Sequence, residues 1–187
     1  MEKIFKISTK DMILSSLFAA FTFIMGFIKI PLPFSPVPIT GQTFAVMLAG
    51  GLLNPVSAFF SIFVFDLLGA VGIPVFSGFV GGINILIGPT GGYLLSLPFA
   101  AFFTSLFLKK TKINFLYVFI ANILFSIILV YFIGIIQLSF ISGINYKKAF
   151  LLGALPFIPG DLIKAFFATY FTLKLKIVII NYEKKQG

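Results

Sequence analysis

The sequence predicts an all-α integral membrane protein: a six-transmembrane-helix bundle whose Gly/Pro-rich outer loops cap a ligand pocket. Three observations predict this fold class. Of the 187 residues, 59% are hydrophobic and only 10% are charged, whereas about a quarter of an average soluble domain is charged. Long apolar runs recur along the chain, and lysines gather at their ends. A chain of this length cannot hide so much apolar surface in a soluble core, so we expect the excess to face lipid.

Six apolar runs qualify as spans, either by length or with neighbouring protein covering their ends. A hydrocarbon layer of about 30 Å needs roughly 20 helical residues. The predicted spans of this single transmembrane domain are residues 12–30, 43–53, 55–72, 90–109, 113–139 and 160–181. The Asn54-Pro55 step separates the second span from the third, because proline disfavours helix at the residue before it.

The charge pattern predicts the orientation. All fourteen basic residues are lysines, against five acidic residues, and lysines near span ends favour the cytoplasm. Six spans place both termini, the 53–54 turn and the KKTK segment (109–112) in the cytoplasm, with loops 31–42, 73–89 and 140–159 outside. The terminal lysines behind this assignment are Lys3, Lys6, Lys10, Lys174, Lys176, Lys184 and Lys185. We therefore interpret the net charge of +9 as a topology signal in a cell membrane, not as a sign of nucleic-acid binding.

Several kinds of chemistry are disfavoured by composition. Without Cys or His, the chain lacks thiolate metal sites, the commonest zinc ligand and the usual neutral-pH general base. GPTGG (88–92) lacks the spacing and the lysine of a phosphate-binding loop. We therefore expect no catalytic residue, no metal site and no nucleotide-binding motif. An intramembrane enzyme is disfavoured on these grounds, and a non-transporting scaffold is the alternative if no ligand binds.

The three outer loops are apolar despite their many glycines and prolines. The segments are PLPFSPVPIT (31–40), GIPVFSGFVGGINILIGPTGG (72–92) and LPFIPG (155–160). Irregular backbone at membrane depth must be satisfied within protein or around a cavity, so we expect these loops to fold as a cap above a pocket. The polar residues in or beside the loops are Gln42, Asn84 and Tyr93. Each could contact a ligand or satisfy loop backbone.

A charge pair marks the beginning of the sixth predicted span. Asp161 and Lys164 are three residues apart and so share a helix face, while Pro159 and Gly160 suit the helix start. Ionisable residues at membrane depth are costly and usually functional. The pair offers an acceptor and a cationic donor to a small polar ligand. Alternatively, the two side chains pair with each other, or Lys164 extends to the headgroups.

Two further features lie inside predicted spans. Asp66 in the third span could mark an ion or proton pathway, which would make the chain a stand-alone ion- or proton-coupled carrier of a small solute. A lone aspartate in a span is more often a structural hydrogen-bond acceptor or a protonated acid, and that interpretation is favoured here. Ser15/Ala19 and Ser16/Ala20 are small residues spaced four apart, a pattern that allows another helix to approach closely. That helix could belong to a partner subunit or to this chain.

Four segments resemble the BioY family, the biotin-specific S components of energy-coupling factor (ECF) transporters. They are PVPITGQTF (36–44), LLGAVGIPVFSG (67–78), GPTGGY (88–93) and PFIPGDLIKA (156–165), and they occur in the family's order. The resemblance implies high-affinity capture of biotin outside a bacterial cell. It also implies a transmembrane coupling (T) subunit and two ATP-binding subunits as partners. No cofactor is implied for this chain, since biotin is the transported ligand and the partners use ATP.

The resemblance also implies roles for individual residues. The family's Asp and Lys of the last helix match Asp161 and Lys164. The ureido ring of biotin has two N–H donors for a carboxylate and one carbonyl for a cation, while the rest of the ligand suits an apolar enclosure. Lys164 could meet the ureido oxygen or the valerate carboxylate. The implied partner interface, where serines replace the family's usual alanines, comprises Ser15, Ser16, Ala19 and Ala20.

Overall fold

A computed structural model describes residues 8–186, with side chains for residues 8–178. Lys3 and Lys6, and the side chains of Lys184 and Lys185, lie outside the described residues. The helices are α1 (Thr9–Met25), α2 (Gln42–Leu52), α3 (Pro55–Ala70), α4 (Ile83–Ile87), α5 (Gly91–Lys109), α6 (Phe115–Ala121), the π-helix η2 (Asn122–Leu129), α7 (Val130–Ser142), α8 (Tyr146–Gly153) and α9 (Ile158–Gln186). Two short antiparallel strands, β1 (Lys29–Ile30) and β2 (Ile39–Thr40), form a hairpin.

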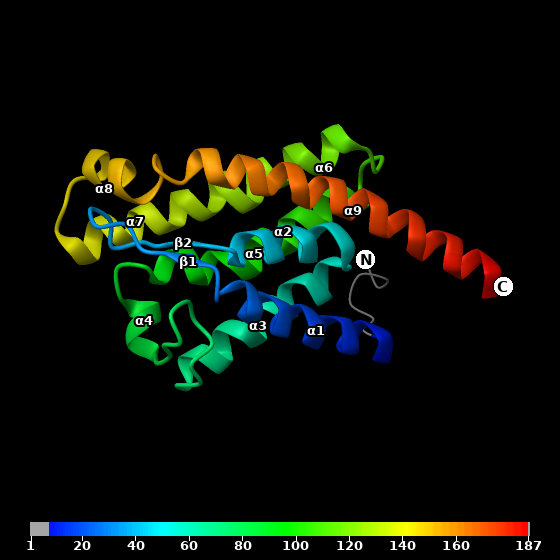
Figure 1. Cartoon of the computed structure of the whole chain (residues 1–187), viewed down its shortest axis with the longest axis horizontal. Coiled ribbons are helices and arrows are strands. Elements are labelled where there is room, and N and C mark those ends of the chain that lie inside the picture. Colours follow the sequence, from blue (N-terminus) through cyan, green and yellow to red (C-terminus); the bar gives the residue numbers. More distant parts are fainter. Residues whose placement is uncertain (1–7, 187) are drawn as a thin grey trace.

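The long helical segments lie side by side, and the β1–β2 hairpin, α4 and α8 lie together at one end of the molecule, which we call the cap end (Figure 1). The beginning of α1, the α2–α3 turn and the C-terminal end of α9 lie at the opposite end. The predicted cap thus contains regular structure that the sequence did not predict. Asn145 begins α8 with a side chain that accepts a hydrogen bond from the Lys148 backbone N–H.

The first helix is shorter than the predicted range 12–30. It ends at Met25 because the chain turns at Gly26 and then enters the hairpin, where Lys29 pairs with Thr40. Gly26 also packs against α2, since a Cβ added there would lie 3.1 Å from Gln42 Nε2. The hydrophobic run therefore extends beyond α1 into strand β1. Hydropathy alone does not show where the helix ends and the strand begins.

Helix α2 is buried among its neighbours and sets how closely they approach. Gly50 faces α5 and Gly51 faces α9: a Cβ added to them would lie 2.7 Å from Thr104 and 2.4 Å from Thr172, respectively. Larger residues at these glycines would push the helices apart. Helix α2 therefore holds α5 and α9 close to itself, and other residues of these two helices line a cavity.

The fifth predicted span is one long helical segment made of α6, η2 and α7. Its π-helical middle begins at the buried Asn122, whose Nδ2 donates to the Thr169 hydroxyl of α9 over 3.3 Å. π-helical turns shift the angular position of the residues that follow. Tyr131, just beyond η2, consequently faces α9 and the cavity.

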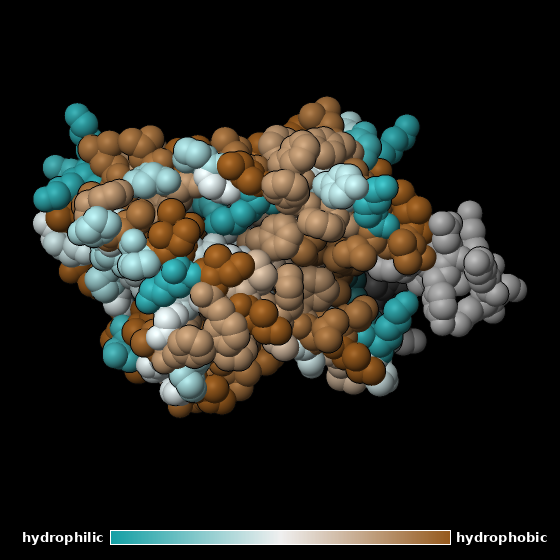
Figure 2. Space-filling model, viewed as in Figure 1, coloured by the Kyte–Doolittle hydropathy of each residue, from teal (hydrophilic) through white to brown (hydrophobic). Residues whose placement is uncertain are grey.

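Within the described part of the chain, two helical segments are long and apolar enough to cross a membrane: Gly91–Lys109 and Phe115–Ser142. The pair α8 and α9, bent by 54°, could supply a third, while α2 and α3 are apolar but shorter. The face in Figure 2 is largely hydrophobic, with hydrophilic residues collected towards its two ends and in a hollow between α9 and the hairpin. Large exposed side chains such as Phe132 and Phe140 contribute to the apolar surface of the described chain.

Candidate ligand-binding site

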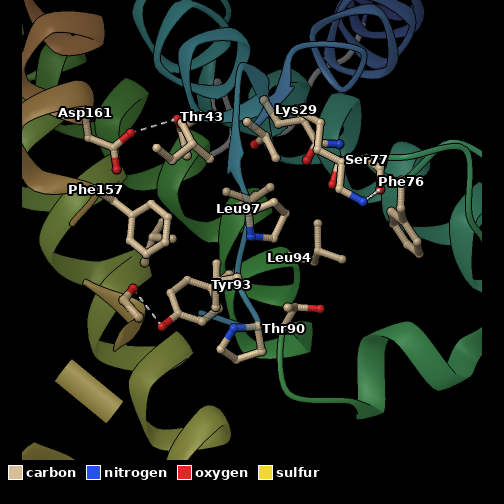
Figure 3. A pocket seen from close by; sticks show the side chains of 18 of the residues that line it. Lys29, Thr43, Phe76, Ser77, Thr90, Tyr93, Leu94, Leu97, Phe157 and Asp161 are labelled. Atoms are coloured by element: carbon tan, nitrogen blue, oxygen red, sulfur yellow. Dashed lines mark hydrogen bonds between the residues drawn. The ribbon is translucent and has the colours of Figure 1, made fainter. Parts of the chain in front are cut away.

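A cavity of about 260 Å³ lies at the cap end, just below the volume range of roughly 300–1,000 Å³ typical of small-molecule sites. The hairpin, the segment before α4 and residues of α2, α5, α7 and α9 surround it (Figure 3). Apolar residues such as Leu94, Leu97 and Phe157 form much of the wall. The polar residues that line it are Lys29, Thr40, Gln42, Thr43, Ser77, Thr90, Tyr93, Tyr131, Asp161 and Lys164.

Asp161 and Lys164 form an ion pair in this cavity, with Lys164 Nζ 2.7 Å from Asp161 Oδ1. Helix α9 begins at Ile158, so Pro159 and Gly160 lie within its first turn and not before it. Proline is tolerated there because the first N–H groups of a helix have no intrahelical partner. The expected mutual pairing is present, and the pair also faces the cavity.

Two side chains missed by the sequence analysis complete this cluster. The Tyr131 hydroxyl donates to Asp161 Oδ2, and the Thr43 hydroxyl lies 3.3 Å from Asp161 Oδ1. Thr43 was within reach of sequence reasoning because it lies in the PVPITGQTF segment. No pattern marked Tyr131, which stands 30 residues from Asp161 on a separate helix.

Lys164 uses its donors fully within the protein. Its ammonium donates to the Thr40 carbonyl over 2.7 Å and to the Thr43 hydroxyl over 3.0 Å, besides Asp161. An ammonium has three N–H donors, so these three bonds saturate it. The pair is thus charge-balanced, and Lys164 holds Asp161 and Thr43 in place.

Gln42 and Tyr93 also line the cavity, but their polar atoms differ in availability. Within residues 8–178, the buried Gln42 Nε2 has no hydrogen-bond partner. Tyr93 instead donates its hydroxyl to the Gly153 carbonyl over 2.9 Å, and its ring packs against Gly134. The Gln42 Nε2 is therefore buried beside Gly26 without a partner among residues 8–178, whereas Tyr93 supplies mainly an aromatic wall.

Asn84 is not among the residues that line the cavity. It lies exposed on the short helix α4, which turns Leu86 inward and Asn84 outward. Its Oδ1 lies close to Gly82, 2.4 Å from where a Cβ would be. The expectation that Asn84 contacts a ligand is therefore not supported by its position in this structure.

The GPTGG segment is a structural turn before α5. Gln137 donates to the carbonyls of Leu86 and Gly88, each over 2.8 Å. A Cβ at Gly91 would lie only 1.7 Å from the Leu86 carbonyl oxygen, so this position needs glycine. The turn consequently joins α4 to α5 and closes one side of the cap.

The two small-residue pairs of α1 face different surroundings. The Ser15 hydroxyl donates to the Ser57 carbonyl of α3 over 3.1 Å, and Ala19 is buried in the bundle. Ser16 and Ala20 are exposed. The Ser15/Ala19 face thus packs within this chain, the second of the two alternatives that the spacing allowed, while the Ser16/Ala20 face is accessible.

Asp66 is buried away from the cavity. Neither of its carboxylate oxygens has a hydrogen-bond partner in the part of the chain that the structure describes, and it is not a lining residue. Across residues 8–178 there is also no group of three or more acidic residues that could hold a metal ion. Asp66 is therefore separate from the polar cluster at the cavity.

Comparison with known proteins identifies the family. The BioY family model matches residues 1–180. The chain belongs to the BioY family. The biotin transporter BioY of Lactococcus lactis subsp. cremoris is 40% identical over 95% of this chain and 92% of its own. The probable biotin transporter BioY of Pyrococcus horikoshii is 43% identical over 83% of this chain and 90% of its own.

Solved structures agree with BioY membership. The S-component for biotin from an ECF-type ABC transporter superposes with a TM-score of 0.85, at 40% identity, covering 89% of this chain and 90% of that one. A second S component of a bacterial ECF transporter shares the fold at 20% identity, with a TM-score of 0.54. BioY membership and the apolar helices make this chain a multi-pass protein of the cell membrane.

Proposed function

We propose that this BioY chain captures biotin as the S component of an ECF-type importer. The main support for this function is the cavity, a mostly apolar enclosure with a hydrogen-bonded Asp161–Lys164 pair on one side. The BioY relatives and the biotin S-component structure support biotin as the ligand. Transport energy comes from a separate T subunit and two ATP-binding subunits, and this chain acts as a transport protein with no catalysis of its own.

The ureido ring of biotin suits the polar side of the cavity. Asp161 Oδ2 accepts one hydrogen bond, from Tyr131, and a carboxylate oxygen can accept two. The remaining position is available to a ureido N–H. The Gln42 Nε2, which lies beside Gly26 without a partner in residues 8–178, would donate to the ureido carbonyl oxygen after the side chain turns into the cavity. Burying both partners without water favours these bonds, because an unpaired buried polar group costs about 1–3 kcal/mol.

The fused sulfur-containing ring and the alkyl chain suit the rest of the cavity. Leu94, Leu97 and Phe157 present apolar surface there, and Tyr93 adds its aromatic ring. Burial of such a ligand contributes roughly 25 cal/mol for each Å² of apolar surface removed from water. The polar cluster thus orients biotin, and the apolar wall supplies affinity.

In the proposed membrane arrangement, α1, α2, α3, α5, the α6–η2–α7 segment and α9 cross the bilayer. The cap end then faces outward, and both termini are cytoplasmic. Helix α2, with 11 residues, is buried among neighbouring helices, which relaxes the length requirement. The exposed Ser16/Ala20 face of α1 is the proposed contact with the T subunit, because small residues permit close helix packing.

Binding by the purified chain tests this proposal. We expect saturable binding of biotin in detergent or nanodiscs without ATP, and no comparable binding of riboflavin or thiamine. A chain that keeps its thermal unfolding transition but binds no biotin would contradict the function. Binding of a different vitamin would retain the S-component role and replace the ligand.

A further inference from the structure

The side chains that line the cavity carry a net positive charge. The charged lining residues are Asp161, Lys164 and Lys29. Asp161 and Lys164 cancel each other in their ion pair. The remaining positive charge belongs to Lys29, so the cavity as a whole favours an anionic ligand.

Lys29 has donor capacity to spare. It lies on β1, and its Nζ makes one hydrogen bond within residues 8–178, to the Ser77 carbonyl over 3.2 Å. No acidic residue of that part of the chain pairs with it. Gly78, with a φ of +89°, leaves room for the ammonium, since a Cβ there would lie 2.4 Å from Nζ. Two N–H groups of Lys29 are therefore available to a ligand.

Lys29 and Asp161 lie on opposite sides of the cavity. In Figure 3, Thr43 lies on the Asp161 side, and the apolar side chains of Leu97 and Leu94 line the part of the cavity between that side and Lys29. A ligand that spans the cavity would therefore meet a polar cluster at one side, apolar side chains in the middle and a cation at the other side. The same order of groups is found in biotin: ureido ring, hydrocarbon and carboxylate.

We infer that Lys29 binds the ligand's carboxylate and makes the site selective for a free acid. This inference rests on the proposed biotin function and deepens it. It also assigns the two lysines different roles. Lys164, with its donors saturated, positions Asp161, while the ammonium of Lys29 forms the charge-assisted bond to the valerate group.

The test compares biotin with biotinamide, in which a neutral amide replaces the carboxylate. The proteins are the parent chain, Lys29→Gln, Lys29→Arg and Lys147→Gln. Lys147 is an exposed lysine of α8 that does not line the cavity, so its variant controls for the loss of a positive charge at the cap end. Titrations at about 0.15 M salt keep long-range attraction screened.

We expect the parent chain and Lys147→Gln to prefer biotin over biotinamide by about tenfold. In Lys29→Gln, biotin affinity falls by about that factor while biotinamide affinity changes little, so the preference disappears. Lys29→Arg keeps the positive charge and should retain most of the preference for biotin over biotinamide. A tenfold preference that survives in Lys29→Gln would overturn the inference and leave biotin capture standing. If the parent chain binds neither compound, the proposed function itself fails.

Discussion

Asp161 and Asp66 are equally buried, each with 4% of its surface exposed, yet their surroundings are opposite. Asp161 accepts hydrogen bonds from Lys164, Thr43 and Tyr131 beside a cavity. Asp66 has no partner among the residues that the structure describes and no access to that cavity. A charged carboxylate is stable in an apolar setting only with such partners. Burial alone therefore does not distinguish the aspartate proposed to bind the ligand from Asp66; hydrogen-bond partners and access to a cavity do.

Among the variants that alter the surroundings of Asp161, Lys164→Met is expected to have the largest effect on biotin affinity and stability. It leaves Asp161 buried without its counter-ion. Removing one member of a buried pair is strongly destabilising. We expect biotin affinity to fall by about a hundredfold, together with a lower melting temperature. The measurements are biotin titration and thermal unfolding of the purified protein.

The double variant Asp161→Asn/Lys164→Met controls for this effect. With both charges gone, the free energy of unfolding should recover towards the parent value, although biotin binding should not. Coupling between the two positions then appears as non-additivity in a double-mutant cycle. Purely additive losses of stability would contradict the paired arrangement.

Tyr131→Phe removes a hydrogen bond to Asp161 but keeps the aromatic ring. We expect about a tenfold loss of biotin affinity, because hydrogen bonds to charged groups contribute about 1.5–3 kcal/mol and solvent or ligand replaces part of that. Tyr117→Phe, at an exposed tyrosine of α6, is the matched control and should bind like the parent. Equal affinities for the parent and Tyr131→Phe would exclude Tyr131 from positioning Asp161.

The smallest effect is expected from Gln42→Leu. Because Gln42 Nε2 has no partner in the described chain, its removal breaks no hydrogen bond from that atom. We expect an unchanged or slightly higher melting temperature, with biotin affinity lower by about fivefold through loss of one neutral hydrogen bond. A loss of stability without a loss of affinity would show a structural role instead.

The sequence alone points to those cavity residues whose polarity or charge contrasts with their apolar neighbours in the chain. Asp161 and Lys164 were conspicuous because they are charges beside a membrane span, and Gln42 and Tyr93 because they flank apolar loops; all four line the cavity. Tyr131 was not accessible, since its direction depends on the π-helical segment before it. Asn84 carried the same signal as Gln42, but the orientation of a five-residue helix is set by packing that sequence does not reveal.

The elements of the fold also differ in whether a local sequence signal predicts them. The sequence placed a helical segment near each predicted range, because long apolar runs and the Asn54-Pro55 step are local signals. It did not reveal the hairpin, α4 or α8, which are short and lie within segments that are apolar but rich in Gly and Pro or follow a predicted span. The strand at Lys29–Ile30 is formed by pairing with Ile39–Thr40, and this pairing also brings Lys29 to the cavity.

A biotin titration of two isosteric variants, Asp161→Asn and Asp66→Asn, tests the central claim most directly. Both replace a buried carboxylate by an amide of nearly the same shape, so any general effect of altering a buried acid is shared. We predict about a hundredfold loss of affinity for Asp161→Asn and less than about a twofold change for Asp66→Asn. Equal losses in the two variants, or a larger loss in Asp66→Asn, would contradict the assignment of Asp161 to the ligand.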